Sequence, residues 1–115
     1  MSVTIYHNPT CSKSRRAVEL IRERGIEPTI IEYLEQPPSA SELDDILNKL
    51  GLEPRALIRT GEPDYAASGL AAPSLTREQL VLGLAAHPRL IERPIVVNGP
   101  RAVVGRPPEK VLDLL

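Results

Sequence analysis

The sequence predicts an α/β domain in which a mixed four-stranded sheet is flanked by helices and carries a helical insertion. Residues 3–34 have the pattern of a strand, a helix and a second strand, and residues 95–115 have the pattern of two strands and a helix. The intervening residues 39–88 carry helical patterns bounded by Gly and Pro. A parallel pair and a hairpin can therefore share one sheet, with the helical segment inserted between them.

The first strand-helix-strand unit is read from short apolar runs and one helical stripe. Val3–Tyr6 and Thr29–Leu34 are predicted strands, and residues 12–24 form the predicted helix, which Gly25 ends. Because a helix connects the two strands, we expect them to be parallel.

The insertion is predicted from two capping boxes, Ser-x-x-Glu and Thr-x-x-Gln, each placed before an apolar helical stripe. The first begins at Ser39 and its helix ends at Gly51, and the second begins at Thr76 and its helix ends near His87. Between them we expect a helical turn at residues 54–58 and then a long surface loop at residues 61–73.

The end of the chain is predicted to be an antiparallel hairpin and a last helix. Ile95–Val97 and Ala102–Val104 are separated by a turn that contains Asn98-Gly99-Pro100. Pro107 fits the first turn of the last helix, where its missing N–H costs nothing.

Composition indicates one domain spanning residues 1–115, in a protein that binds neither nucleic acid nor membrane. The chain is 42% hydrophobic and 25% charged, with a net charge of −1, so no overall field attracts polyanions. It has three Tyr and no Phe or Trp that could stack on bases. No apolar run approaches membrane-spanning length and no signal sequence opens the chain, which favours the cytoplasm. We expect a monomer, and no metal site, because one Cys and two distant His give no ligand cluster.

Cys11 is the only cysteine, and it lies between the first strand and the first helix. Backbone N–H groups and the helix dipole stabilise a thiolate there, so that such cysteines have pKa values of roughly 3.5–7.5 instead of about 8.5. The neighbouring Asn8, Thr10 and Lys13 are not typical of a core. The sequence therefore predicts a reactive nucleophile at Cys11.

The order of elements resembles the thioredoxin-like fold, in which a nucleophilic cysteine follows the first strand. In that fold a proline precedes the third strand and faces the cysteine. Pro94 occupies this position, so the resemblance implies a cis Arg93–Pro94 bond, although only about 5–6% of X–Pro bonds are cis.

Three segments closely resemble the ArsC-type arsenate reductases that are linked to glutathione and glutaredoxin. These segments are His7–Arg15, Arg55–Arg59 and Arg93–Val97, and the similarity continues in order to Gly105-Arg106-Pro107. The resemblance implies that the protein reduces arsenate to arsenite without a bound cofactor. Glutathione is then the co-substrate and glutaredoxin the partner that recycles the enzyme.

The resemblance also implies a role for each of six residues. Cys11 is the nucleophile, His7 and Ser14 assist it, and the oxyanion is bound by Arg59, Arg93 and Arg106. Three guanidinium groups suit a tetrahedral dianion, because they offer fixed, permanently charged donors.

Other functions are less consistent with these residues. The phosphatase-like arsenate reductases need a Cys-(x)5-Arg loop, and position 17 is Ala. Spx-like regulators of the same fold bind RNA polymerase and sense oxidation through a Cys-x-x-Cys pair, but Ser14 takes the second position here. Such a regulator, and a paralogue that keeps the oxyanion site for another substrate, stay open as alternatives.

Overall fold

The computed structural model describes residues 2–115, and the chain divides into two compact units. One unit joins Met1–Gln36 to Arg93–Leu115, and the other is Pro37–Glu92.

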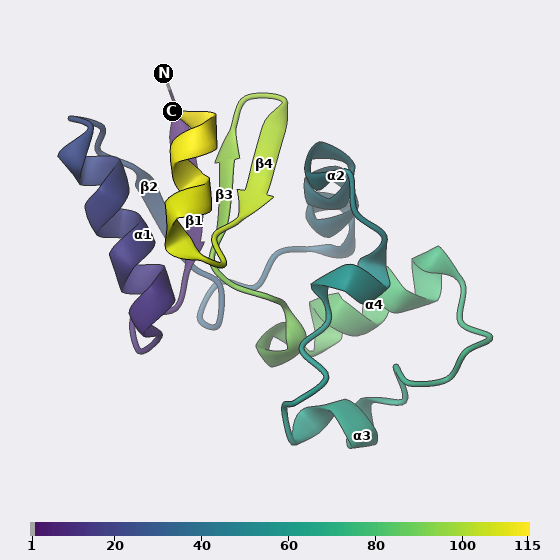
Figure 1. Ribbon diagram of the computed structural model, residues 1–115. Helices are drawn as coiled ribbons and strands as arrows, with labels where there is room; N and C mark the ends of the chain where they lie inside the picture. Colours follow the sequence, from purple (N-terminus) through teal and green to yellow (C-terminus); the bar gives the residue numbers. More distant parts are fainter. Residues whose placement is uncertain (1) are drawn as a thin grey trace. The chain divides into compact units, whose positions relative to one another are not determined.

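A four-stranded mixed sheet forms the centre of the first unit. Its strands are β1 (Val3–His7), β2 (Thr29–Glu32), β3 (Ile95–Asn98) and β4 (Arg101–Val104), in the spatial order β2-β1-β3-β4 (Figure 1). β1 is parallel to β2 and antiparallel to β3, and β3 is antiparallel to β4. The predicted mixed sheet is therefore confirmed, as are its parallel pair and its hairpin.

Two helices of this unit cover one face of the sheet. They are α1 (Ser12–Glu23) and the 3₁₀ helix η3 (Pro108–Leu114), which lie side by side in Figure 1. The core beneath them takes alternate residues of the strands and one stripe of each helix. Its fully or nearly fully buried members are Val3, Ile5, Ala17, Val18, Leu20, Ile21, Val96, Val111 and Leu114.

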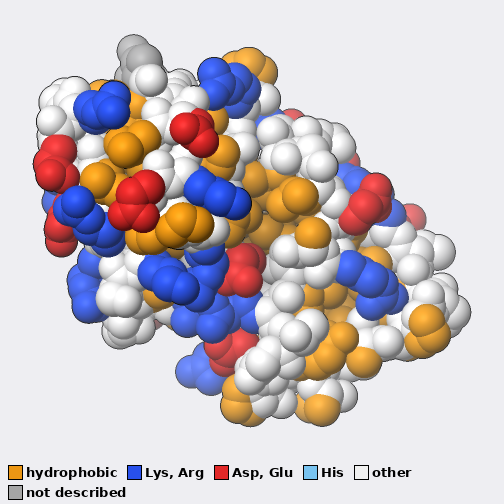
Figure 2. Space-filling model, viewed as in Figure 1, with side chains coloured by type: hydrophobic (Ala, Val, Ile, Leu, Met, Phe, Trp, Pro, Cys, Tyr) orange, Lys and Arg blue, Asp and Glu red, His pale blue; other side chains and the backbone are white. Residues whose placement is uncertain are grey.

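Charged side chains of both signs are interspersed over the outer surfaces of α1 and η3 (Figure 2). The pairs within α1 and after it include Arg16 with Glu19 at 3.0 Å and Arg22 with Glu27 at 2.9 Å. These pairs are exposed, so they contribute little to stability.

Several element boundaries in the first unit differ from the prediction. β2 ends at Glu32, short of Leu34, because the Glu32 carbonyl accepts hydrogen bonds from the N–H groups of Glu35 and Gln36, both at 2.9 Å. β1 and both hairpin strands are each one residue longer than predicted. Pro107 is extended (φ −68°, ψ 161°) and precedes the last helix, which begins at Pro108 and has 3₁₀ geometry.

The second unit is helical. It contains α2 (Ala40–Leu50), η1 (Pro54–Leu57), α3 (Asp64–Ser68), α4 (Arg77–Ala86) and η2 (Pro88–Leu90). Buried residues of α2 and α4 face each other, and these are Leu43, Ile46, Leu47, Leu80, Val81 and Leu84. The prediction of a long loop at residues 61–73 was wrong in one respect, because the short helix α3 lies within this segment.

Both capping boxes are confirmed. The Ser39 hydroxyl accepts a hydrogen bond from the Glu42 N–H at 3.1 Å, and the Glu42 carboxylate accepts one from the Ser39 N–H at 3.3 Å. Thr76 and Gln79 make the same reciprocal pair at 3.2 and 2.9 Å. Each box satisfies N–H groups that the first helical turn leaves without a partner.

The Arg93–Pro94 peptide bond is cis, as predicted, and the Arg106–Pro107 bond is cis as well. Gly105 lies against this region, and its N–H donates to the Pro94 carbonyl at 2.8 Å. A Cβ atom on Gly105 would come within 2.9 Å of the Pro94 ring and 3.1 Å of Val111. Only glycine therefore fits at this position without movement of the Pro94 ring or of η3.

Gly105→Ala should consequently lower the free energy of unfolding by about 1–3 kcal/mol, the usual cost of overpacking. Urea unfolding followed by circular dichroism measures this loss. Gly61→Ala is the matched control, because a Cβ there has nothing within 4 Å and should change stability by less than about 1 kcal/mol. Equal stability of Gly105→Ala and the wild type would contradict the close packing.

Candidate active site

The sheet register brings four chain segments to one end of the first unit. Tyr6 pairs with Ile95, and Ile95 pairs with Val104, while His7 pairs with Glu32. The loop after β1, the residues after β2, the residues before β3 and the residues after β4 therefore lie at the same end of the sheet. This arrangement positions Cys11, Arg93 and Arg106.

The loop that carries Cys11 is organised by Asn8. The Asn8 side-chain oxygen accepts hydrogen bonds from the Thr10 N–H at 3.0 Å and the Thr10 hydroxyl at 2.8 Å. Its backbone carbonyl accepts the Cys11 N–H at 3.0 Å. Such Asx turns hold a short loop in one conformation, so Asn8 fixes where helix α1 begins.

Cys11 occupies the N-cap of α1, as the sequence predicts. Its backbone is extended (φ −94°, ψ 122°), and its carbonyl accepts the Arg15 N–H at 3.0 Å as the first bond of the helix. It is a free cysteine and is partly exposed. The sulfur is therefore accessible and lies beside the N–H groups of the first turn.

The pKa of the Cys11 thiol is lowered below its ordinary value. Burial is the largest single influence and acts to raise the pKa, because it disfavours the thiolate. The Ser14 N–H, the Arg93 guanidinium and the Lys13 N–H oppose it by hydrogen bonding to the sulfur, and the charge of Arg93 adds to their effect. Together these donors outweigh burial, so the site stabilises a thiolate.

Arg93 is the charged partner of that thiolate. Burial acts to lower the pKa of the Arg93 guanidinium, but its hydrogen bond to Cys11 and the neighbouring Tyr33 hydroxyl raise the pKa overall. Arg106 donates from Nη1 to the Arg93 carbonyl at 3.1 Å. Arg93 therefore lies beside Cys11, and Arg106 contacts the Arg93 backbone. The predicted role of Arg106 as an oxyanion ligand stays a prediction.

His7 and Ser14 form a buried pair next to this loop. His7 Nδ1 lies 2.6 Å from the Ser14 hydroxyl oxygen, which also accepts the Asn8 N–H at 3.0 Å. Ser14 has no exposed surface, and His7 and Asn8 are 9% and 6% exposed. With its oxygen occupied by Asn8, the Ser14 hydroxyl can donate its proton to the neutral imidazole.

The pKa of His7 is lowered, chiefly because burial disfavours the charged ring. Glu32 acts to raise it, whereas Arg15 and Arg22 lower it further. His7 therefore favours the neutral form in the folded protein. His7 Nδ1 contacts the Ser14 hydroxyl, so His7 acts on the Cys11 loop through Ser14 and Asn8 and positions it.

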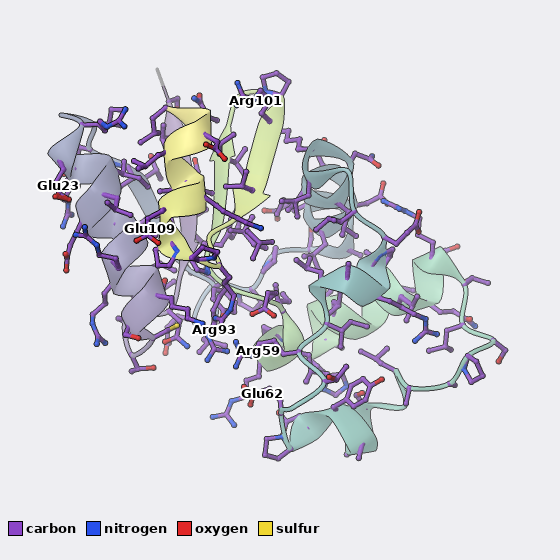
Figure 3. The ribbon with its side chains drawn as sticks, viewed as in Figure 1. Glu23, Arg59, Glu62, Arg93, Arg101 and Glu109 are labelled. Carbon is purple, nitrogen blue, oxygen red and sulfur yellow. The ribbon has the colours of Figure 1, made fainter. Side chains whose placement is uncertain are left out.

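Arg59 belongs to the second unit. Its Nε lies 3.2 Å from Glu62 Oε1 and its Nη1 lies 3.1 Å from Glu92 Oε1. Figure 3 labels Arg59 and Glu62 beside one another. The grouping of Arg59 with Cys11 stays a prediction.

The chain is similar to known proteins over nearly its whole length. The family model described as the ArsC family matches residues 6–114. The chain belongs to the ArsC family. It is 47% identical to an arsenate reductase of Neisseria meningitidis over 114 residues, which are 98% of this chain and 97% of that protein. It is 46% identical to the uncharacterized protein YfgD of Escherichia coli K12, over 98% of this chain and 96% of that one.

The fold is likewise shared with solved structures. The structure of an arsenate reductase from Vibrio cholerae superposes with a TM-score of 0.96 at 49% identity, covering 100% of this chain and 98% of that one. This ArsC-family chain therefore has the thioredoxin-like fold that the order of elements predicts.

Two residues that contribute to the site were not singled out from the sequence. Asn8 sits before a proline, a pair that often starts a turn, and this signal could have marked it as the residue that shapes the loop. Tyr33 is 1% exposed and lies just after β2, where nothing in the sequence connects it with Arg93. Its role depends on the pairing of β2 with β1.

Within residues 2–115, no three His, Cys, Asp or Glu side chains come together as a metal would need. Over the same residues, no helix combines the length and apolar character that crossing a membrane requires. A cavity of about 260 Å³ lies between α2 and α4, lined by residues that include Ser41, Arg77 and Leu82. No predicted site residue lines it.

Arg93→Gln should raise the pKa of the Cys11 thiol toward its ordinary value, because the amide keeps a donor but loses the charge. The pH dependence of the rate of alkylation by iodoacetamide measures this pKa. Arg16→Gln is the control, since Arg16 pairs with Glu19 and Glu23 on the exposed side of α1. Superimposable profiles for the wild type and Arg93→Gln would show that the backbone donors alone hold the thiolate.

The buried His7 should make stability depend on pH. Its lowered pKa means that the folded protein binds this proton less readily than the unfolded chain does. The stability that neutral His7 contributes is therefore complete above the unfolded pKa of about 6.5 and is lost as the pH falls from there toward the folded pKa. In urea titrations between pH 8 and pH 5, His7→Asn should lose less stability than the wild type. Parallel curves for the two proteins would refute the assignment.

Proposed function

We propose that this protein is an arsenate reductase that uses the Cys11 thiolate as its nucleophile and glutathione and glutaredoxin as its source of electrons. The observation that carries the proposal is the lone cysteine at the N-cap of α1, hydrogen-bonded to Arg93 and with a lowered thiol pKa. Relatives that share nearly the whole chain are named arsenate reductases, which is consistent with this chemistry.

In the first step, the Cys11 sulfur attacks the arsenic atom of arsenate. A sulfur–arsenic bond forms, one arsenic–oxygen bond breaks, and the oxygen leaves as water after protonation. Arg93 and Arg106, with Arg59 from the second unit, hold the negative charge of the oxyanion. Charged guanidinium donors fixed before the reaction suit this task.

In the second step, glutathione supplies the reducing equivalents. Its thiolate attacks the Cys11 sulfur, so a disulfide forms and the sulfur–arsenic bond breaks. The electron pair of that bond stays on arsenic, which is reduced from As(V) to As(III) and leaves as arsenite. Glutaredoxin then attacks the glutathione sulfur and returns Cys11 to the thiolate.

The external thiol is required because Cys11 is the only cysteine in the chain. Position 14, where a second thiol would form a Cys-x-x-Cys pair, holds a fully buried Ser14 bonded to His7 and Asn8. This feature argues against an Spx-like redox switch. The cycle needs no bound cofactor and one copy of the chain, and it suits the cytoplasm, where glutathione keeps thiols reduced.

Arsenate reduction should depend on both added glutathione and added glutaredoxin, and Cys11→Ser should abolish it. A coupled assay that follows NADPH oxidation measures turnover, and Arg16→Gln is the control variant. Cys11→Ser should still bind oxyanion, because the arginines bind and the sulfur reacts.

Two outcomes would overturn the proposal. One is reduction of arsenate that survives in Cys11→Ser. The other is a wild-type protein that is inactive with every thiol donor and binds RNA polymerase, which would favour the regulator.

A further inference from the structure

Arg59 and Glu92 are held next to each other by a short backbone ladder inside the second unit. The Arg59 N–H donates to the Leu90 carbonyl at 2.7 Å, and the Glu92 N–H donates to the Leu57 carbonyl at 2.8 Å. Between these bonds, Ile58 and Ile91 form an antiparallel bridge. In this register Arg59 lies opposite Leu90 and Glu92 lies opposite Leu57. Arg59 and Glu92 are therefore diagonal neighbours on one face of the ladder, a separation that long side chains can span.

A second carboxylate is brought to Arg59 from its other side. The Glu62 N–H donates to the Arg59 carbonyl at 3.4 Å, which closes a turn and returns the Glu62 side chain to the guanidinium. Arg59 Nε donates to Glu62 Oε1 at 3.2 Å, and Arg59 Nη1 donates to Glu92 Oε1 at 3.1 Å. Two different N–H groups of the fork are therefore occupied by two different carboxylates.

These contacts are better shielded from water than a typical surface ion pair. The side chains of Arg59, Glu62 and Glu92 are 22%, 24% and 25% exposed. Partial burial strengthens the attraction and reduces screening by salt. One guanidinium also faces two carboxylates, so these three side chains together carry a net negative charge.

The planar donors that bind a carboxylate are the same donors that bind a tetrahedral oxyanion. An oxyanion that uses Arg59 must therefore displace Glu62 or Glu92 from the fork, or share the guanidinium with them. Either event costs part of the attraction already present in the protein. The affinity for oxyanion is then lower than Arg59 alone would give.

We propose that Glu62 and Glu92 are positioning residues that act through Arg59, and that they weaken oxyanion binding by competing for its guanidinium. The proposal rests on the function proposed above, in which Arg59 binds the oxyanion. It assigns the two carboxylates an effect opposite to that of a structural support, whose loss would weaken binding.

Glu92→Gln tests this competition, because the amide has nearly the same shape and keeps an oxygen that can accept from Arg59. At low ionic strength it should lower the dissociation constant for sulfate about three- to tenfold, since a charged competitor becomes a neutral one. Isothermal titration calorimetry measures the constant. Glu62→Gln should change it in the same direction, and the double variant should change it further.

Two controls isolate the effect. Glu53→Gln removes one negative charge from the same unit at an exposed residue whose side chain caps nothing, and it should change the constant less than twofold. In an Arg59→Ala background, Glu92→Gln should also change the dissociation constant for sulfate less than twofold, because the guanidinium for which Glu92 competes is absent. Circular dichroism establishes that each variant is folded.

Kinetics give a readout that a structural role would not produce. Glu92→Gln should lower KM for arsenate by a similar factor without raising kcat, as expected when substrate and transition state gain equally. Weaker sulfate binding in both Gln variants, or a full gain in the Arg59→Ala background, would overturn the competition.

The design separates this proposal from the proposed function. If Arg59→Ala binds sulfate as well as the wild type, Arg59 is not an oxyanion ligand and the competition is refuted. Thiol-dependent turnover through Cys11 would be unaffected by that result. If the wild type shows no thiol-dependent arsenate reduction, the proposed function is refuted. The sulfate-binding measurements still decide whether Glu62 and Glu92 compete for Arg59.

Discussion

The hydrogen bond between Arg93 and Cys11 is the interaction on which the candidate site depends. Partial burial of a reactive sulfur acts to raise the pKa of its thiol, so other groups must stabilise the thiolate. Helix N–H groups supply part of the compensation, and they are available only because Cys11 stands at the N-cap. Arg93 supplies the charge, and it reaches the sulfur because β3 lies antiparallel to β1 and begins where β1 ends. The thiolate is therefore a property of the sheet register as much as of the cysteine.

A buried polar network of His7, Asn8 and Ser14 holds the loop that places the sulfur. This network restricts which residues can occupy these three positions. The Ser14 hydroxyl satisfies both the Asn8 N–H and His7 Nδ1, and all three residues are nearly buried. Removing one member leaves the others without a partner in a region that water does not reach easily, which is costly. A hydroxyl at position 14 thus has a structural use that a thiol, a weaker donor and acceptor, would serve poorly.

Much of the fold could be predicted from the sequence, because its signals are local. Ser39 with Glu42 and Thr76 with Gln79 mark helix starts through contacts three residues apart, and Gly25 and Gly51 end helices in the left-handed conformation that favours glycine. The short helix α3 escaped prediction because its five residues carry no apolar stripe and none is buried. β2 ended early because of a turn at Glu32 whose hydrogen bonds leave no mark in the strand pattern.

Some site residues could likewise be predicted from the sequence, whereas others depend on contacts between distant parts of the chain. Cys11 at a helix start could be recognised from its neighbours, and the resemblance to the ArsC family pointed to Arg93 and Arg106. Tyr33 could not be found, because its place beside Arg93 follows from the pairing of distant strands, and Glu62 and Glu92 acquire meaning only once their contacts with Arg59 are known.

Charge also gives the proposed cycle a direction. Arginines cannot lose their charge at any physiological pH, so they hold an anionic substrate and lose most of their hold when the product is neutral. Arsenite at neutral pH is uncharged, so the reduction itself removes the reason for the product to stay. Carboxylates that are already within 3.2 Å of Arg59 can then reoccupy its guanidinium. In this scheme the same ion pairs that oppose binding also favour release, and a site that bound arsenate as tightly as its arginines allow would gain affinity without gaining turnover.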